Sequence, residues 1–217
     1  MFFEQTTEEL AVGQRLLQAA ATISAHFEGE GREVLLVIDS QVITSEQIAS
    51  LHHFANARGI TTLLFVPVND LHQPTDKMLL NELDAQIWFN PVRASQGLWP
   101  AIDPLASCSR LLESNVVTLE HQQVAQQVRE ILERYYKLRE ETNNAPREEE
   151  KQQILARGER IDLFFSQPFV VAEAFTDIPG TYLKREETIS SFRDLLDGRY
   201  DSLPAQAFKF VGQIEQS

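Results

Sequence analysis

The chain has 217 residues, of which 43% are hydrophobic and 24% charged, an ordinary composition for a globular protein with a buried core. Its 32 acidic residues outnumber its 19 basic ones, and the resulting net charge of −13 argues against nucleic acid and anionic lipid surfaces as general partners. A single cysteine, Cys108, excludes an internal disulfide or a cysteine-rich zinc site, and no apolar run is long enough to cross a bilayer. With no secretory leader evident at its start, we expect a cytoplasmic protein without direct membrane insertion.

The first half of the chain alternates helical and strand-like segments. A capping-box spacing from Thr6 to Glu9 starts a predicted helix that Gly29 and Gly31 end. The apolar face expected for this helix consists of Leu10, Leu17, Ala20, Ile23 and Phe27. The continuous apolar run of residues 34–38 then predicts a strand that is buried on both faces.

Similar signals continue to residue 89. Ser45 starts a second predicted helix, which Gly59 ends, and residues 61–68 form a second apolar strand. A short helix over 75–83 and a third strand over 86–89 follow. Strands that alternate with helices favour a parallel sheet, so the sequence predicts an α/β fold with a reduced, mostly parallel sheet flanked by helices.

The second half is predicted to be helical. One helix is indicated by an apolar face of Val124, Val128, Ile131, Tyr135 and Leu138. The acidic run Glu148, Glu149 and Glu150 favours the start of the next helix through the helix dipole, and that helix stops at residues 166–168. A shorter helix over 186–197 ends at Gly198.

No complete catalytic constellation is visible in the sequence. Asp39 follows an apolar strand, where a polar residue either ends the strand or serves as a magnesium-associated carboxylate. None of the nine glycines belongs to a phosphate-binding Gly-x-x-x-x-Gly-Lys-Ser/Thr loop. The five histidines show no metal-ligand spacing, so we expect no catalytic residue and no metal site. The acidic run 148–150 is either a solvated helix start or a contact for a basic partner.

Several motifs from residue 98 onward resemble the beta subunit of the F-type ATP synthase. Residues 99–105 (WPAIDPL) are similar to that family's Tyr-Pro-Ala-Val-Asp-Pro-Leu segment, and residues 166–176 (SQPFVVAEAFT) are the most specific match. Further matches occur at 107–112 and 196–212, whereas in the first half residues 33–39 (EVLLVID) resemble the family's Walker B strand. The resemblance implies a truncated, degenerate relative without the family's β-barrel domain and phosphate loop.

By this resemblance, residues 1–98 are the remnant of a nucleotide-binding α/β domain. Residues 99–217 then combine the adenine-side segment with a C-terminal helical domain like that of the ATP synthase alpha and beta subunits. Asp39 corresponds to the magnesium-associated carboxylate, and Glu148, Glu149 and Glu150 correspond to the acidic lever that pushes on the rotor. The catalytic glutamate and the phosphate-contacting arginine of the family have no counterpart here.

The adenine side is the part of the nucleotide site that the resemblance retains. Trp99 takes the place of the tyrosine that stacks on the base, and Phe169, Ala172 and Phe175 match the rest of the slot. Stacking on aromatic rings is worth about 1–3 kcal/mol per base, so ATP or ADP would bind weakly and no cofactor is required. The alternative is that these aromatic residues only pack a core between the domains.

Three functions follow from these features. The first is a non-catalytic structural or regulatory protein that binds ATP synthase alpha-type or gamma-type subunits, or itself, and is peripheral to a membrane through that complex. A sheet with so few apolar strands supports it, since an edge or face is left to be covered. The second is an adenine-nucleotide sensor that uses the retained slot. The third is a diverged component of proton-driven ATP synthesis.

Overall fold

A computed structural model describes residues 7–39, 45–67, 80–81, 83–113, 115–140 and 149–214. The chain divides into two compact units, residues 1–83 and residues 84–217, which we treat separately. The sequence placed the domain boundary at 98/99, whereas contacts assign residues 84–98 to the second unit. Within that unit, Leu98 belongs to the core and the backbone nitrogen of Asn90 donates to the carbonyl of Ala101 over 2.7 Å.

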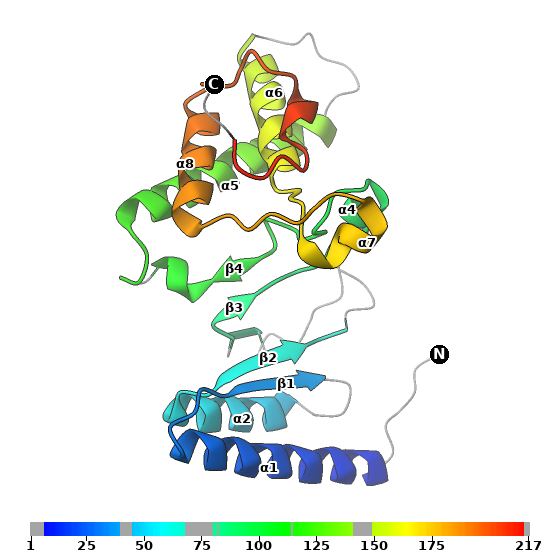
Figure 1. Cartoon of the computed structure of the whole chain (residues 1–217), viewed down its shortest axis with the longest axis vertical. Coiled ribbons are helices and arrows are strands. Elements are labelled where there is room, and N and C mark those ends of the chain that lie inside the picture. Colours follow the sequence, from blue (N-terminus) through cyan, green and yellow to red (C-terminus); the bar gives the residue numbers. More distant parts are fainter. Residues whose placement is uncertain are drawn as a thin grey trace. The chain divides into compact units, whose positions relative to one another are not determined.

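The first unit is a β-α-β arrangement preceded by a long helix (Figure 1). Helix α1 (Thr7–Gly29) leads to β1 (Leu35–Asp39), and α2 (Ser45–Arg58) connects β1 to β2 (Thr61–Phe65). The two strands pair in parallel, with Leu35 opposite Thr61 and Asp39 opposite Phe65. Gly59 adopts a φ of +68°, a left-handed conformation that ends α2 and turns the chain into β2. The predicted parallel α/β arrangement is confirmed.

Only one face of this sheet is covered within the described residues. Leu36, Ile38 and Leu64 pack against Ile48, Leu51 and Phe54 of α2, and Leu17 and Ala21 of α1 join the same cluster. The alternate side chains project from the other face and are between 44% and 61% exposed; they are Leu35, Val37, Leu63 and Phe65. The prediction of a strand buried on both faces is therefore wrong, because both helices pack on the same side.

The buried face of α1 also differs from the expected one. Leu17 points toward the core and Ser24 is buried, whereas Ile23 and Phe27 are exposed. The side chain of Leu10, and Thr6 of the expected capping box, lie outside the described residues. The single face expected from helical spacing is therefore only partly right: Leu17 packs against the core, whereas α2 leaves Ile23 and Phe27 in solvent.

The third expected strand does not join the parallel sheet. It is the short strand β3 (Ala85–Gln86), which pairs antiparallel with β4 (Cys108–Ser109), and Phe89 forms an isolated bridge with Ile102. The helix expected over 75–83 lies mostly outside the described residues, although residues 80 and 81 are helical.

The second unit is built mainly from helices. In chain order they are α4 (Pro91–Ser95), η2 (Arg110–Glu113), α5 (Leu119–Glu140), α6 (Glu149–Phe164), η3 (Val170–Ala172), α7 (Glu173–Thr176), α8 (Arg185–Leu196) and η4 (Ala205–Phe208). The three predicted helices are α5, α6 and α8. The predicted end of α6 and both predicted ends of α8 agree with the structure to within two residues, whereas the break expected after α5 lies outside the described residues.

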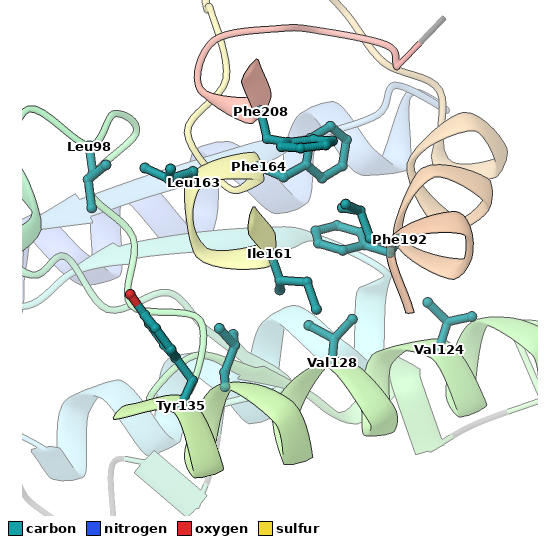
Figure 2. Close-up of a cluster of buried hydrophobic side chains, with 11 residues drawn as sticks. Leu98, Val124, Val128, Tyr135, Ile161, Leu163, Phe164, Phe192 and Phe208 are labelled. Carbon is teal, nitrogen blue, oxygen red and sulfur yellow. The ribbon is translucent and has the colours of Figure 1, made fainter. Parts of the chain in front are cut away.

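Side chains from α5, α6, α8 and η4 meet in one core (Figure 2). Leu132, Ile161 and Phe164 are at most 1% exposed, and the rings of Phe164 and Phe192 meet edge to face with centroids 5.0 Å apart. A Cβ atom at Gly158 would lie 2.5 Å from the Cβ of Tyr135, so glycine permits the close approach of α6 to α5. This core positions the segments that carry the candidate site.

Candidate functional site

The four residues of the predicted adenine slot all belong to the second unit. Trp99 precedes a cis peptide bond to Pro100, and its carbonyl accepts a 2.9 Å hydrogen bond from the backbone nitrogen of Gln167. Phe169 lies directly before η3, which ends at Ala172, and Phe175 lies on α7. The structure therefore brings the backbone of residue 99 next to the segment that leads to Phe169.

A folded loop holds residues 168–181. The backbone nitrogen of Thr181 donates to the carbonyl of Pro168 over 3.0 Å, and the nitrogen of Gly180 donates to a Glu173 carboxylate oxygen over 2.7 Å. A Cβ atom at Gly180 would collide with the backbone of Val170, so only glycine allows the loop to cross there. These contacts fix η3 and α7 against the loop that follows them.

The slot residues differ in how far they reach solvent. Phe175 is 88% exposed and Trp99 is 41% exposed, whereas Phe169 and Ala172 are half-buried. No ring contact joins Trp99, Phe169 and Phe175 in the part of the chain that the structure describes. Trp99 and Phe175 are thus accessible from solvent, and their role in binding a base stays a prediction.

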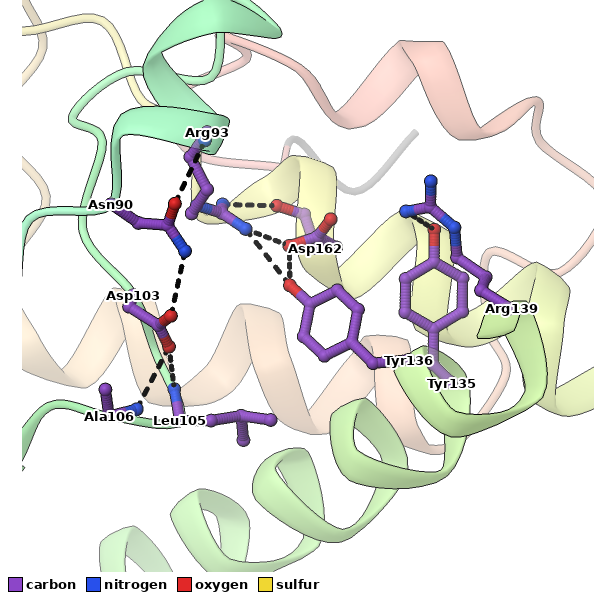
Figure 3. A network of polar contacts seen from close by, with 9 residues as sticks. All are labelled: Asn90, Arg93, Asp103, Leu105, Ala106, Tyr135, Tyr136, Arg139 and Asp162. Carbon is purple, nitrogen blue, oxygen red and sulfur yellow. Dashed lines mark hydrogen bonds and ion pairs between the residues drawn. The ribbon is translucent and has the colours of Figure 1, made fainter. Parts of the chain in front are cut away.

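A buried polar cluster anchors the segment that carries Trp99 (Figure 3). Arg93 on α4 is 5% exposed, and it pairs with the Asp162 carboxylate of α6. The Arg93 guanidinium also donates to the hydroxyl of Tyr136 over 3.1 Å, and that hydroxyl donates to Asp162 over 2.7 Å. Burial, followed by the negative charge of Asp162, raises the pKa of Tyr136, so this hydroxyl remains a proton donor.

The same segment is held by two further contacts. The Asn90 side chain caps α4 by accepting from the backbone nitrogen of Val92 over 2.9 Å, and its amide donates to Asp103 over 3.0 Å. The Arg129 guanidinium of α5 donates to the carbonyls of Pro104, Leu105 and Ser107. Sequence analysis missed the Arg93–Asp162 pair, because residues 69 positions apart leave no local pattern.

Asp39 is the last residue of β1 in the first unit, where it is exposed and lies opposite Phe65 in the sheet register. The described residues contain no group of three or more histidine, cysteine, aspartate or glutamate side chains that could hold a metal ion. The position of Asp39 at a carboxyl end of the strand is as predicted, and its association with magnesium remains a prediction.

Two of the three predicted lever residues can be described. Glu149 and Glu150 are the first residues of α6, whereas Glu148 lies outside the described residues. A carboxylate oxygen of Glu150 accepts from Arg134 of α5 over 3.2 Å, and both side chains are exposed. In the structure, the described part of the acidic run starts α6 and contributes one exposed ion pair to α5, worth up to about 1 kcal/mol.

A surface hollow of about 670 Å³ lies elsewhere on the second unit. Its lining includes Gln96, Tyr135, Arg139, Glu159 and Lys209, and none of the predicted site residues. Its walls carry charges of both signs. Among the described helices, none combines the length and the apolar character needed to span a bilayer.

Comparison with models of known protein families finds no match for this chain. Among solved structures, the chain resembles the ATPase EscN from the type III secretion system of enteropathogenic E. coli, seen in its assembled form. The TM-score is 0.60 at 20% sequence identity, over 83% of this chain and 49% of the EscN chain. The chain thus spans about half the length of EscN. This likeness establishes an ATPase-like α/β fold with a C-terminal helical region, and it does not single out the ATP synthase beta subunit.

Proposed function

We propose that the chain is a beta-subunit-like, non-catalytic protein that acts as a structural or regulatory partner of rotary ATP synthase subunits or a related assembly. The observation that carries the proposal is the uncovered face of the parallel sheet, formed by Leu35, Val37, Leu63 and Phe65. Parallel sheets are ordinarily covered on both faces. A partner subunit that packs on this face would complete the layer that α1 and α2 begin on the other side.

The fold supports the choice of partner. EscN is described as an assembled ATPase, and the present chain aligns with half of it. Because EscN was solved in an assembled form, we infer that the chain packs beside a subunit of the alpha or gamma type. The pattern of residues 99–105 and 166–176 favours the ATP synthase lineage within this fold.

The non-catalytic part of the proposal rests on sequence. Phosphoryl transfer is catalysed almost entirely by positioning and by neutralising the charge of the phosphates, for which these 217 residues contain no phosphate loop. Magnesium is usually held by one or two carboxylates together with substrate phosphates, and Asp39 has no phosphate loop beside it in the sequence. We therefore assign the chain to binding rather than to turnover.

The test is co-purification of the tagged full chain from its own cells, with quantitative mass spectrometry of what it retains. We expect alpha-type or gamma-type subunits in stoichiometric amounts, and we expect Leu63→Lys to reduce their recovery at least tenfold. Leu119→Lys is the matched control, because Leu119 is an equally apolar, exposed residue of the second unit. Recovery of the chain without such subunits, or equal loss in both variants, would refute the proposal.

A second candidate, an adenine-nucleotide sensor, is favoured by the exposure of Trp99 and Phe175. Base stacking on these rings would give weak binding of ADP or ATP. In a Trp88→Phe background, millimolar ADP should quench the fluorescence of Trp99, and Phe175→Ala should weaken that response. An unchanged spectrum at millimolar ADP would eliminate the sensor while leaving the partner proposal intact.

A further inference from the structure

Helix α1 carries a second apolar stripe that nothing in the described structure covers. Val12, Leu16, Ile23 and Phe27 are between 37% and 60% exposed. The core-facing side of the helix is separate, because Leu17 and Ala21 pack toward α2. At 3.6 residues per turn, the four exposed side chains fall within a stripe about 60° wide that runs along most of the helix.

The stripe has an internal symmetry. Leu16 and Ile23 lie equally far from the peptide bond between Ala19 and Ala20, and so do Val12 and Phe27. Small alanine side chains therefore occupy the centre, and larger apolar residues flank them on both sides. An antiparallel copy of the same helix would match this pattern, since in a two-fold contact each residue meets the residue of the second copy that lies equally far on the other side of the centre.

Charge favours a second copy at this place. The whole chain has a net charge of −13, so two copies repel each other over most of their surfaces. Residues 10–27 of α1, however, contain no aspartate or glutamate; Arg15 is their single formal charge at neutral pH. Along residues 10–27 two copies can thus approach with little of the repulsion that acts elsewhere, and only at the ends of the pair does the same register set Glu9 opposite Glu30 of the second copy.

We propose that α1 forms an antiparallel pair with α1 of a second copy of this chain. Leu16 packs against Ile23 of the second copy, Val12 packs against Phe27 of the second copy, and the alanines allow the axes to cross closely. This inference is independent of the proposed function, which uses the opposite side of the first unit's sheet.

The area of the stripe limits the strength of the contact. Helix α1 has 23 residues and is therefore about 35 Å long, and a helix presents a face about 10 Å wide. The pair would bury about 700 Å² in total, below the roughly 1,200 Å² at which stable interfaces begin. We expect a weak, reversible dimer rather than a permanent one.

Sedimentation of the full chain over a concentration series up to about 1 mM tests the association. We expect the sedimentation coefficient to rise with concentration, and both Leu16→Glu and Ile23→Glu to lower the association constant at least tenfold. Thr22→Glu is the control: it adds the same charge to the same helix, about a third of a turn away from the stripe. Circular dichroism establishes that each variant is folded.

Cysteine cross-linking tests the direction of the pair. In a Cys108→Ser background, mixing Leu16→Cys with Ile23→Cys chains under oxidation should give a disulfide-linked heterodimer, whereas either variant alone should give little product. A parallel pair would instead link Leu16→Cys chains to each other. The proposal is overturned by that result, by a monomer at every concentration, or by a dimer that both glutamate variants leave unchanged.

Discussion

In the second unit, Leu132, Ile161 and Phe164 are enclosed from several directions by α5, α6, α8 and η4. In the first unit, two helices cover one face of a two-stranded sheet, and apolar side chains remain exposed on the other face and on α1. The second unit also has the buried Arg93–Asp162 pair to fix its segments. The difference is one of enclosure: the core of the second unit lies between several elements, whereas the core of the first unit is one layer between a single sheet face and two helices.

The largest expected effect comes from removing the buried cation of the second unit. Arg93→Met leaves the Asp162 carboxylate buried and unpaired, and should lower the free energy of unfolding of this unit by about 3–5 kcal/mol. Both tryptophans, Trp88 and Trp99, belong to residues 84–217, so denaturant unfolding followed by tryptophan fluorescence reports on this unit.

Two further variants serve as controls for that measurement. Arg134→Met removes an exposed ion pair and should cost about 1 kcal/mol or less. Combining Arg93→Met with Asp162→Leu should restore much of the loss, because neither partner of this pair is then left buried with an uncompensated charge. A loss in Arg93→Met no greater than in Arg134→Met would show that the cluster does not stabilise the unit.

The contrast between the units can be measured with one substitution made in each. Leu132→Ala should lower the unfolding free energy of the second unit by about 2–5 kcal/mol, because Leu132 is fully buried and a cavity remains. Leu63→Ala, at an exposed position of β2, should change the free energy of amide-exchange protection in the first unit by less than about 1 kcal/mol. Hydrogen exchange resolved by peptide measures both, and equal effects would contradict the comparison.

Alkaline pH should destabilise the second unit through Tyr136. The pKa of this residue is raised in the folded state above its ordinary value near 10, so the unfolded chain loses the proton first as pH rises. The stabilisation is complete below about pH 10 and is lost as pH rises from there through the folded pKa. Tyr136→Phe should flatten the fall in unfolding free energy above pH 10, whereas Tyr182→Phe, at an exposed position, should leave it steep.

The smallest effect is expected at the acidic start of α6. Glu150→Gln removes an exposed pair with Arg134 and should cost about 1 kcal/mol or less at low salt, with still less cost at high salt. Thermal unfolding at two salt concentrations measures this. A large, salt-independent loss would mean that Glu150 has a structural role that its exposed position does not explain.

Parts of the candidate site followed from the sequence, and other parts did not. The start of α6 at Glu149 and the end of β1 at Asp39 depend on helix and strand signals within a few residues, so local patterns predicted them. The support of the Trp99 segment depends on Arg93, Asp162 and Tyr136, which are brought together only when α4 packs on α5 and α6. Neither the composition nor the spacing of residues in the sequence predicts such a contact.

The sequence by itself determined the helices, the parallel pair of strands and the helical character of the second half, because hydrogen bonding and apolar periodicity act over short stretches. Tertiary structure decided which apolar faces are buried. Val37 and Ile23 match core patterns as well as Ile38 and Leu17 do, but α2 packs on only one side of the sheet and one side of α1. Periodicity identifies the apolar faces of a helix or strand. Whether such a face is buried depends on whether an element distant in sequence packs against it.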